Sequence, residues 1–230
     1  MRRHDLLRIT PLAWLSMLQD HPGLAEVPLV EGWASHGWPV IVRRHAPCDI
    51  VAGVPAALPL PPLYGKRRIG LCLSGKANMT RLPAVSLRDA AVSAPGTWQA
   101  TIAALLALGD RLGRAPDVFG ALLWEHVTGL PYITATSDID LLWRATNQKT
   151  AQAIVTGLIE IDQASPIRID GEVELPDGGG VNWRELAQVL AGTSDHVLVK
   201  RMDGVSACVM AALFAASPEP AAAMSSRQSA

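Results

Sequence analysis

Hydrophobic and polar positions follow two different periods along this chain, and each change of period marks the boundary of an element. Beyond about residue 90 the two periods succeed one another regularly. Helical spacing predicts helices at 98–112, 122–128, 150–161 and 183–190, and alternation predicts strands at 117–121, 136–143, 167–175, 196–201 and 205–210. Asn182 and Glu185 fit the two positions of a capping box at the start of the last helix.

Residues 1–90 differ in composition from the rest of the chain, because they are rich in proline and tryptophan. Thr10 and Pro11 predict the N-cap and first position of a helix that runs to Leu18. Segments 39–44 and 69–73 predict strands. We therefore predict a smaller N-terminal domain at 1–90 that binds substrate or carrier, a catalytic domain at 91–215 and, at 216–230, a disordered tail with too little to bury.

Composition excludes several classes of protein. A chain of 230 residues that is 49% hydrophobic is long and apolar enough to fold around a core. Its net charge of −1 argues against a general nucleic-acid binder, which would carry a basic excess. The odd count of three widely spaced cysteines favours a reducing compartment. The N-terminus lacks the apolar region of a signal peptide and no apolar run could span a bilayer, so we expect a cytoplasmic protein without membrane contact.

Two aspartates stand two positions apart in the strand TSDIDLLW. Strand side chains alternate, so Asp138 and Asp140 share one face, while Ser137, Ile139 and Leu141 share the other. Two residues of strand rise separate the Cα atoms of the aspartates by roughly 6.6 Å. Their carboxylates can therefore lean toward one point.

Such a pair is unfavourable without a cation. Two like charges about 5 Å apart repel by roughly 3 kcal/mol at an effective dielectric near 20. Either one aspartate takes up a proton, or a metal ion lies between the two. Magnesium accepts one or two protein carboxylates and completes its shell with water and phosphate oxygens. The pattern is typical of a site where phosphate arrives together with the metal.

A second acidic strand follows in RIDGEVEL, where Asp170 and Glu172 fall on one face. If this strand lies beside the first, either residue can supply a third carboxylate. The competing interpretation is that both acidic strands are solvated faces of a sheet, because a single D-x-D is common. Two acidic strands joined by one crossover helix favour the metal site.

The order of these segments resembles that of the nucleotidyltransferase superfamily, which includes the polymerase-β-like enzymes. A strand with a glycine (PDVFGALLW), a short helix, TSDIDLLW, a helix and RIDGEVEL follow one another. Gly120 stands at the superfamily's Gly-Ser turn, and Ala121 departs from that pattern. The resemblance implies an α+β fold, with a nucleotidyltransferase-like mixed β-sheet flanked by helices and a smaller N-terminal α/β domain.

A closer resemblance is to the malonate decarboxylase holo-acyl-carrier-protein synthase family, also called phosphoribosyl-dephospho-CoA transferases. It is carried by RRHDLL, LPLPPLYGKRRIGL, GLPYITATSDIDLLW, RIDGEVELPDGGGVNWREL and HVLVKRMDGV, which together reach most of the chain. The resemblance implies that the donor is 2'-(5-triphosphoribosyl)-3'-dephospho-CoA. The acceptor would be a serine of the apo acyl-carrier subunit of malonate decarboxylase, and diphosphate would be released.

The resemblance also assigns roles to residues. Asp138 and Asp140 would hold Mg²⁺, with Mn²⁺ as a substitute, and Asp170 would be the third metal ligand. Asp170 or Glu172 would help to deprotonate the carrier serine, with Asp170 slightly favoured. The candidates for contact with the anionic substrate are Lys66, Arg67, Arg68, Gly120, Ser137 and Lys200.

Other interpretations compete with these assignments. The basic residues equally fit solvated charge clusters. Another nucleotidyltransferase reaction is an alternative, such as prosthetic-group transfer to a citrate lyase carrier or nucleotide transfer to a small molecule. A non-catalytic relative that binds nucleotide or carrier is a second. For any of these, we expect the ligand cleft between the two domains.

Overall fold

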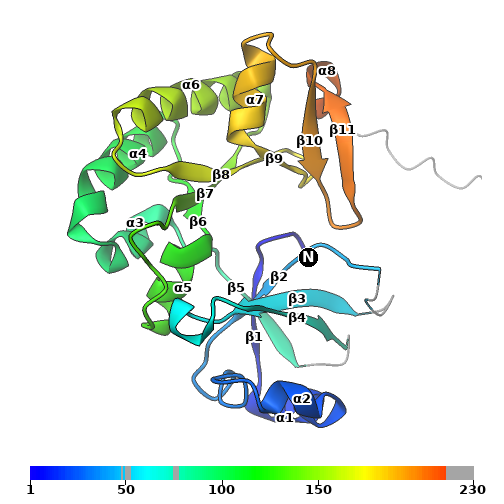
Figure 1. Ribbon diagram of the computed structural model, residues 1–230. Helices are drawn as coiled ribbons and strands as arrows, with labels where there is room; N and C mark the ends of the chain where they lie inside the picture. Colours follow the sequence, from blue (N-terminus) through cyan, green and yellow to red (C-terminus); the bar gives the residue numbers. More distant parts are fainter. Residues whose placement is uncertain (48, 50–52, 75–77, 216–230) are drawn as a thin grey trace, which may run out of the picture.

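The computed structural model describes residues 1–47, 49, 53–74 and 78–215, and within them the strands form two sheets (Figure 1). The helices are α1 (Pro11–Asp20), α2 (Pro22–Ala25), α3 (Leu87–Ala90), α4 (Gln99–Arg111), α5 (Gly120–Thr128), α6 (Gln148–Ala164), α7 (Trp183–Leu190) and α8 (Met210–Leu213). The strands are β1 (Leu6–Ile9), β2 (Val40–Val42), β3 (Val54–Pro59), β4 (Arg68–Leu73), β5 (Met79–Leu82), β6 (Asp117–Val118), β7 (Ile139–Arg144), β8 (Ile169–Glu174), β9 (Gly180–Asn182), β10 (His196–Lys200) and β11 (Val205–Val209). No helix in the described part of the chain has the length and apolar character needed to cross a bilayer.

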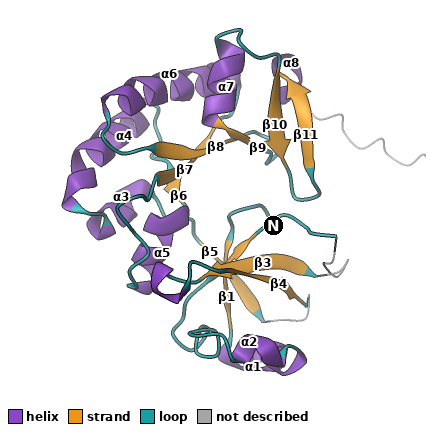
Figure 2. Ribbon diagram, viewed as in Figure 1, coloured by secondary structure: helices purple, strands orange, loops and turns teal. Residues whose placement is uncertain are grey.

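The first sheet is antiparallel throughout, with the strand order β4-β3-β2-β1-β5. Helix α1 packs its buried Trp14 and Leu18 into the core of this sheet together with Trp33. As predicted, Thr10 caps α1, and its side chain accepts a hydrogen bond from the backbone N–H of Ala13. Figure 2 shows α1 and α2 on the side of this sheet that faces away from the rest of the molecule.

The second sheet is mixed, with the order β11-β10-β9-β8-β7-β6. Only β7 and β8 run parallel among the described strands, and α6 forms the crossover between them. Helices α4, α6 and α7 lie on the outer side of this sheet, so its other face is turned toward the N-terminal sheet (Figure 2). The predicted α+β fold is thus confirmed.

The two halves also share a core. Trp124 of α5 and Tyr132 are buried in the cluster that α1 forms with the N-terminal sheet. The hydroxyl of Tyr132 donates a hydrogen bond to the carbonyl of Pro59 at 2.9 Å. Leu6 of β1, in return, is buried in the core of the second half. The sheets are therefore packed together through α5 and β1.

Several predicted boundaries need correction. The strand predicted at 117–121 ends at Val118, because Gly120 adopts a left-handed φ of +64° and opens α5. The strand predicted from 136 begins at Ile139, because Thr134 and Ser137 form a turn closed by three hydrogen bonds. The capping box is half wrong: Asn182 caps α7, but Glu185 accepts a hydrogen bond from Leu198. The tail at 216–230 lies outside the described residues.

The two glutamates of β8 are removed from solvent. Glu172 and Glu174 are each only 6% exposed. Arg2 pairs with Glu174 at 2.5 Å and Arg3 pairs with Glu172 at 2.9 Å. The residues just ahead of β1 therefore bring positive charge from the first sheet to the buried acids of the second. The interpretation of the acidic strand as a solvated face is therefore excluded for Glu172 and Glu174, whereas Asp170 is partly exposed.

Gly171 separates the acids of β8 and cannot carry a side chain. Its φ is +141°, and a Cβ there would lie 2.0 Å from the carbonyl oxygen of Leu141 on β7. We predict that Gly171→Ala lowers the free energy of unfolding by about 3 kcal/mol or more, because backbone atoms of the parallel pair would have to separate. Urea denaturation measures the loss.

Gly204→Ala is the matched control. Gly204 lies between β10 and β11 without a left-handed φ, and a Cβ there would meet no atom within 4 Å. Equal urea midpoints for the two variants would contradict the prediction.

Candidate active site

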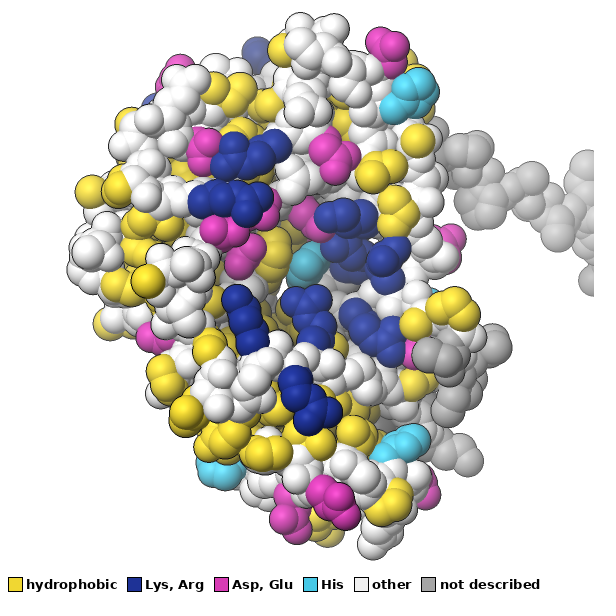
Figure 3. Space-filling model, viewed as in Figure 1, with side chains coloured by type: hydrophobic (Ala, Val, Ile, Leu, Met, Phe, Trp, Pro, Cys, Tyr) yellow, Lys and Arg dark blue, Asp and Glu magenta, His cyan; other side chains and the backbone are white. Residues whose placement is uncertain are grey.

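A cavity of about 220 Å³ opens where the first sheet meets α5 and β7. Around it the structure gathers six of the residues predicted from the sequence, which are Lys66, Arg68, Gly120, Ser137, Asp138 and Asp140. Figure 3 shows the surface hollowed between the two halves of the molecule, with Lys and Arg side chains gathered around the hollow. The expected position between two lobes is therefore where these side chains meet.

Gly120 and Asp140 fit together closely. A Cβ on Gly120 would lie 1.8 Å from Oδ2 of Asp140. The N–H of Phe119 donates to the carbonyl of Asp140 at 3.1 Å, which ties the start of α5 to β7. A glycine is needed here both for the left-handed backbone and for the space that the carboxylate occupies.

The second acidic strand lies directly beside the first. Asp140 and Asp170 are paired in register across the parallel strands β7 and β8. Oδ1 of Asp170 accepts hydrogen bonds from its neighbour Gly171 N–H at 2.7 Å and from the side chain of Asn182 at 3.1 Å. Asn182, which also caps α7, therefore fixes the orientation of the Asp170 carboxylate.

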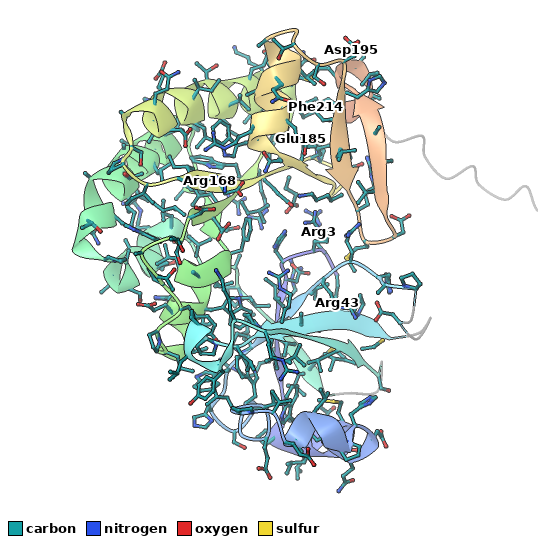
Figure 4. The ribbon with its side chains drawn as sticks, viewed as in Figure 1. Arg3, Arg43, Arg168, Glu185, Asp195 and Phe214 are labelled. Atoms are coloured by element: carbon teal, nitrogen blue, oxygen red, sulfur yellow. The ribbon has the colours of Figure 1, made fainter. Side chains whose placement is uncertain are left out.

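Arg168 connects two of the three aspartates. Its guanidinium lies 3.1 Å from Asp138 and 3.4 Å from Asp170 (Figure 4). Asp138 directly precedes β7 and Arg168 directly precedes β8, so this contact joins the amino ends of the two parallel strands. Part of the negative charge is therefore neutralised by the protein itself.

Asp140 is the one of these three aspartates that Arg168 does not contact. Burial raises the pKa of its carboxyl to about 7, and the neighbouring charges of Asp170 and Asp138 act in the same direction. Arg168 and Arg68 oppose this shift only in part. A bound cation would remove the repulsion, and no buried cation pairs with Asp140 among the described residues.

Glu172 stands in a different environment, although it lies on the same strand. Burial alone would raise its pKa, but hydrogen bonds from His4 and Arg3 and the charge of Arg3 hold the pKa well below its ordinary value. Lys200 adds an ion pair at 3.0 Å. Its charge is thus offset by the protein, unlike that of Asp140.

Whether a metal ion fits can be judged from the donors. Within the described residues, no group of three or more His, Cys, Asp or Glu side chains stands ready to hold a metal ion. Asp138 and Asp140 nevertheless line one cavity, and magnesium requires only one or two protein carboxylates. The two hard oxygen donors and the excess negative charge around Asp140 fit Mg²⁺ bound through a pair of aspartates. Asp170, the predicted third metal ligand, instead pairs with Arg168 and does not line this cavity.

Three of the sequence-predicted substrate residues differ in placement from the expectation. Arg67 is exposed and does not line the cavity, whereas its neighbours Lys66 and Arg68 do. Lys200 pairs with Glu172 instead of lining the cavity. Ser137 lies in the turn before β7, so strand alternation does not apply to it, and it lines the cavity beside Asp138.

A second cavity, of about 490 Å³, adjoins the first and was not foreseen from the sequence. Arg3, His4, Arg43, Arg44 and His45 line it. Figure 4 shows Arg43 beside the N-terminal sheet and Arg3 in the space between the two sheets. The available signal was the tripeptide Arg-Arg-His, which occurs at 2–4 and again at 43–45.

His4 also lines this cavity and has an unusual backbone conformation. Its φ of +67° is in the left-handed region, which non-glycine residues rarely adopt. The ring packs on Phe119 with centroids 4.7 Å apart, and its Nε2 lies 3.4 Å from Glu172. His4 thus links β1, the start of α5 and β8 at one point.

Comparison with known proteins agrees with this architecture. The family model described as phosphoribosyl-dephospho-CoA transferase MdcG N-terminal domain matches residues 2–83, and the model of the C-terminal domain matches residues 86–211. No solved structure matches the chain.

Curated relatives cover nearly the whole chain. A phosphoribosyl-dephospho-CoA transferase of Xanthomonas campestris pv. campestris is 41% identical over 216 residues, which are 92% of this chain and 97% of the relative. A protein of the same name from Bradyrhizobium diazoefficiens is 36% identical over 205 residues, covering 88% of each chain. One from Pseudomonas putida W619 is 32% identical over 202 residues, covering 86% of this chain and 88% of the relative.

We predict that Gly120→Ala drives the Asp140 side chain out of its position, because the new methyl would occupy the space of the carboxylate. A crystal structure of the variant measures the displacement. Gly129→Ala is the control, since Gly129 has a similar φ of +70° but a Cβ there would meet no atom within 4 Å. Gly129→Ala should cost only about 1–2 kcal/mol of backbone strain. An unmoved Asp140 in Gly120→Ala would contradict this account.

We further predict that the metal-free protein loses stability as pH rises from about 4 to about 7 because of Asp140. The folded-state pKa lies above the unfolded one, so the native state binds the extra proton in this window and gives up that stabilisation as the carboxyl ionises. Asp140→Asn removes the titration. The measurement is the free energy of unfolding by urea in EDTA, for Asp140→Asn and for wild type. The value for the variant minus the value for wild type should therefore increase from pH 4.5 to pH 7.5. A difference independent of pH would refute this prediction.

Proposed function

This chain belongs to the phosphoribosyl-dephospho-CoA transferase family, and we propose that it transfers the phosphoribosyl-dephospho-CoA group of 2'-(5-triphosphoribosyl)-3'-dephospho-CoA to a serine of the apo acyl-carrier subunit of malonate decarboxylase. In this reaction the serine oxygen forms a bond to the α-phosphorus of the triphosphate. The bond from that phosphorus to the bridging oxygen breaks, and diphosphate leaves. The carrier retains a phosphodiester.

The observation that carries the proposal is that Asp138 and Asp140 line one cavity together with Lys66 and Arg68. Asp170 is not among the residues that line this cavity, but it pairs with Asp140 in register on the neighbouring strand. Carboxylates and cations facing one small cavity suit a metal-bound triphosphate. The size of the cavity, about 220 Å³, suits a chain of phosphates better than a whole coenzyme.

We assign Asp138 and Asp140 as the ligands of Mg²⁺, with Mn²⁺ as a substitute. When bound, the cation would neutralise the charge that develops on the departing diphosphate. Lys66 and Arg68 would bind phosphate oxygens, since neither residue forms an ion pair with the described acidic residues. Gly120 would hold Asp140 in position by leaving room for its carboxylate.

Asp170 is the better candidate for accepting the proton of the carrier serine. It lies beside Asp140 in register, and Asn182 fixes its orientation. Glu172 is the weaker candidate, because its lowered pKa and its pairs with Arg3 and Lys200 disfavour protonation. We therefore propose that Glu172 supports the structure between the two sheets.

The reaction of the named relatives carries over to this chain as a group transfer from a dephospho-CoA derivative. The choice of the malonate decarboxylase carrier over another carrier, and a cytoplasmic location, are part of this proposal. They follow from the family resemblance of the motifs, and the test below distinguishes the carriers.

We predict that the purified protein, with Mg²⁺ and the triphosphoribosyl precursor, raises the mass of the apo malonate decarboxylase carrier by one prosthetic group. Intact-mass spectrometry of the carrier measures the transfer. Asp138→Asn and Asp140→Asn should each reduce the rate by about 10³-fold or more, because the charge of the reacting phosphates would lose its counter-ion.

Asp110→Asn is the matched control, because Asp110 is an exposed aspartate whose partner is Arg88, outside the cavity. A carrier whose acceptor serine is replaced by alanine must stay unmodified. Modification of an apo citrate lyase carrier in preference to the malonate decarboxylase carrier would redirect the assignment. Near-normal transfer by both aspartate variants would overturn the proposed site.

A further inference from the structure

The two cavities share part of their lining. The larger one, of about 490 Å³, shares Arg68, Gly120, Trp124 and Asp140 with the smaller one. If the smaller cavity takes the triphosphate, the rest of a donor of this size must extend into the neighbouring space. Sites for molecules of drug size or above occupy about 300–1,000 Å³, which matches the larger cavity and exceeds the smaller one.

The larger cavity has an apolar floor beneath a basic rim. Ile41 and Val42 of β2 and Ala57 and Pro59 of β3 supply the floor. Small and apolar side chains of this kind suit the uncharged parts of a nucleotide or pantetheine chain. The combination fits an amphipathic ligand with an anionic centre.

The charges around the cavity are strongly unbalanced. Among its lining residues, Asp140 is the single acid, against the four cations Arg3, Arg43, Arg44 and Arg68. Such a surplus within a cleft attracts an anion and raises its local concentration.

Ion pairing decides which of these cations can serve a ligand. Arg3 is committed to Glu172 and Arg43 to Asp49, which Arg43 holds through two short hydrogen bonds. Arg44 and Arg68 take part in none of the ion pairs formed by the described residues. Arg44 is in addition exposed, so its guanidinium is open to an incoming anion.

The segment that carries Arg44 is held from both sides. Arg43 donates hydrogen bonds to the carbonyls of Ala56 and Leu71 in the first sheet. The N–H of His45 donates to the carbonyl of Met202, in the turn between β10 and β11, at 2.8 Å. Arg44 is thus presented by backbone that both halves of the molecule fix, which lowers the entropy lost on binding.

We propose that this larger cavity binds the dephospho-CoA portion of the donor, with Arg44 and Arg68 as the ligands of its diphosphate. The inference rests on the proposed function, since it takes the donor from there. Arg68 lines both cavities and stands between the transferred phosphoryl group and this second pair of phosphates. The apolar floor receives the uncharged remainder of the coenzyme.

The test uses 3'-dephospho-CoA, which has the diphosphate but lacks the triphosphate. Its binding to the full-length protein is measured by calorimetry in EDTA, so that no metal site contributes. Arg44→Gln should weaken binding about tenfold or more, the usual effect of losing a charge-assisted hydrogen bond. Arg44→Lys should recover part of the affinity, and Asp138→Asn should still bind.

Arg114→Gln is the matched control, an exposed arginine beyond α4 that lines neither cavity. The urea midpoint of Arg44→Gln must equal that of wild type, so that a loss of binding reports the site and not the fold. Wild-type affinity in Arg44→Gln would overturn the inference, as would wild-type protein that does not bind 3'-dephospho-CoA. The carrier-mass assay then tells the two proposals apart, because transfer by wild type upholds the proposed function in either case.

Discussion

Buried negative charge on one strand determines how this molecule is put together. Glu172 and Glu174 on β8 are removed from water, and a buried carboxylate is strongly unfavourable unless a cation pairs with it. Two of the cations come from outside the sheet, Arg2 and Arg3 ahead of β1, and Lys200 comes from β10 of the same sheet. By satisfying these acids, the N-terminal segment is drawn across the second sheet, and the cavities form where the two sheets face each other.

The same strands show how neighbouring acids can serve different ends. Glu172 is surrounded by Arg3, His4 and Lys200, so its charge is permanent and structural. Asp140, with the Gly120 backbone against it, has two other aspartates as neighbours and an elevated pKa. Incomplete neutralisation is what makes a group responsive to an added cation, and it sets Asp140 apart from the acids farther along the sheet.

Patterns within short segments of the sequence were enough to predict the elements that hold the acidic residues. Alternation on 136–143 and 167–175 predicted two acidic strands, and the structure pairs them in register. The family resemblance and the α+β class were likewise available from the sequence. The contacts of Arg3 and His4 with Glu172 were not, because the partner lies far along the chain and leaves no periodic signal. The place of Arg44 beside the larger cavity likewise depends on how the chain folds. The turn before β7 and the left-handed Gly120 also escaped, since hydrophobic spacing does not report backbone dihedral angles.

The ion pairs of the N-terminal segment have a consequence for how the chain acquires its structure. Arg3 and Glu172 are 169 residues apart in sequence, and Arg2 and Glu174 are 172 apart. Contacts of such separation close large loops and form slowly. During synthesis, the two arginines leave the ribosome early and remain without partners until β8 follows. The ion pairs that join the two halves can thus form only after nearly the whole polypeptide has been made.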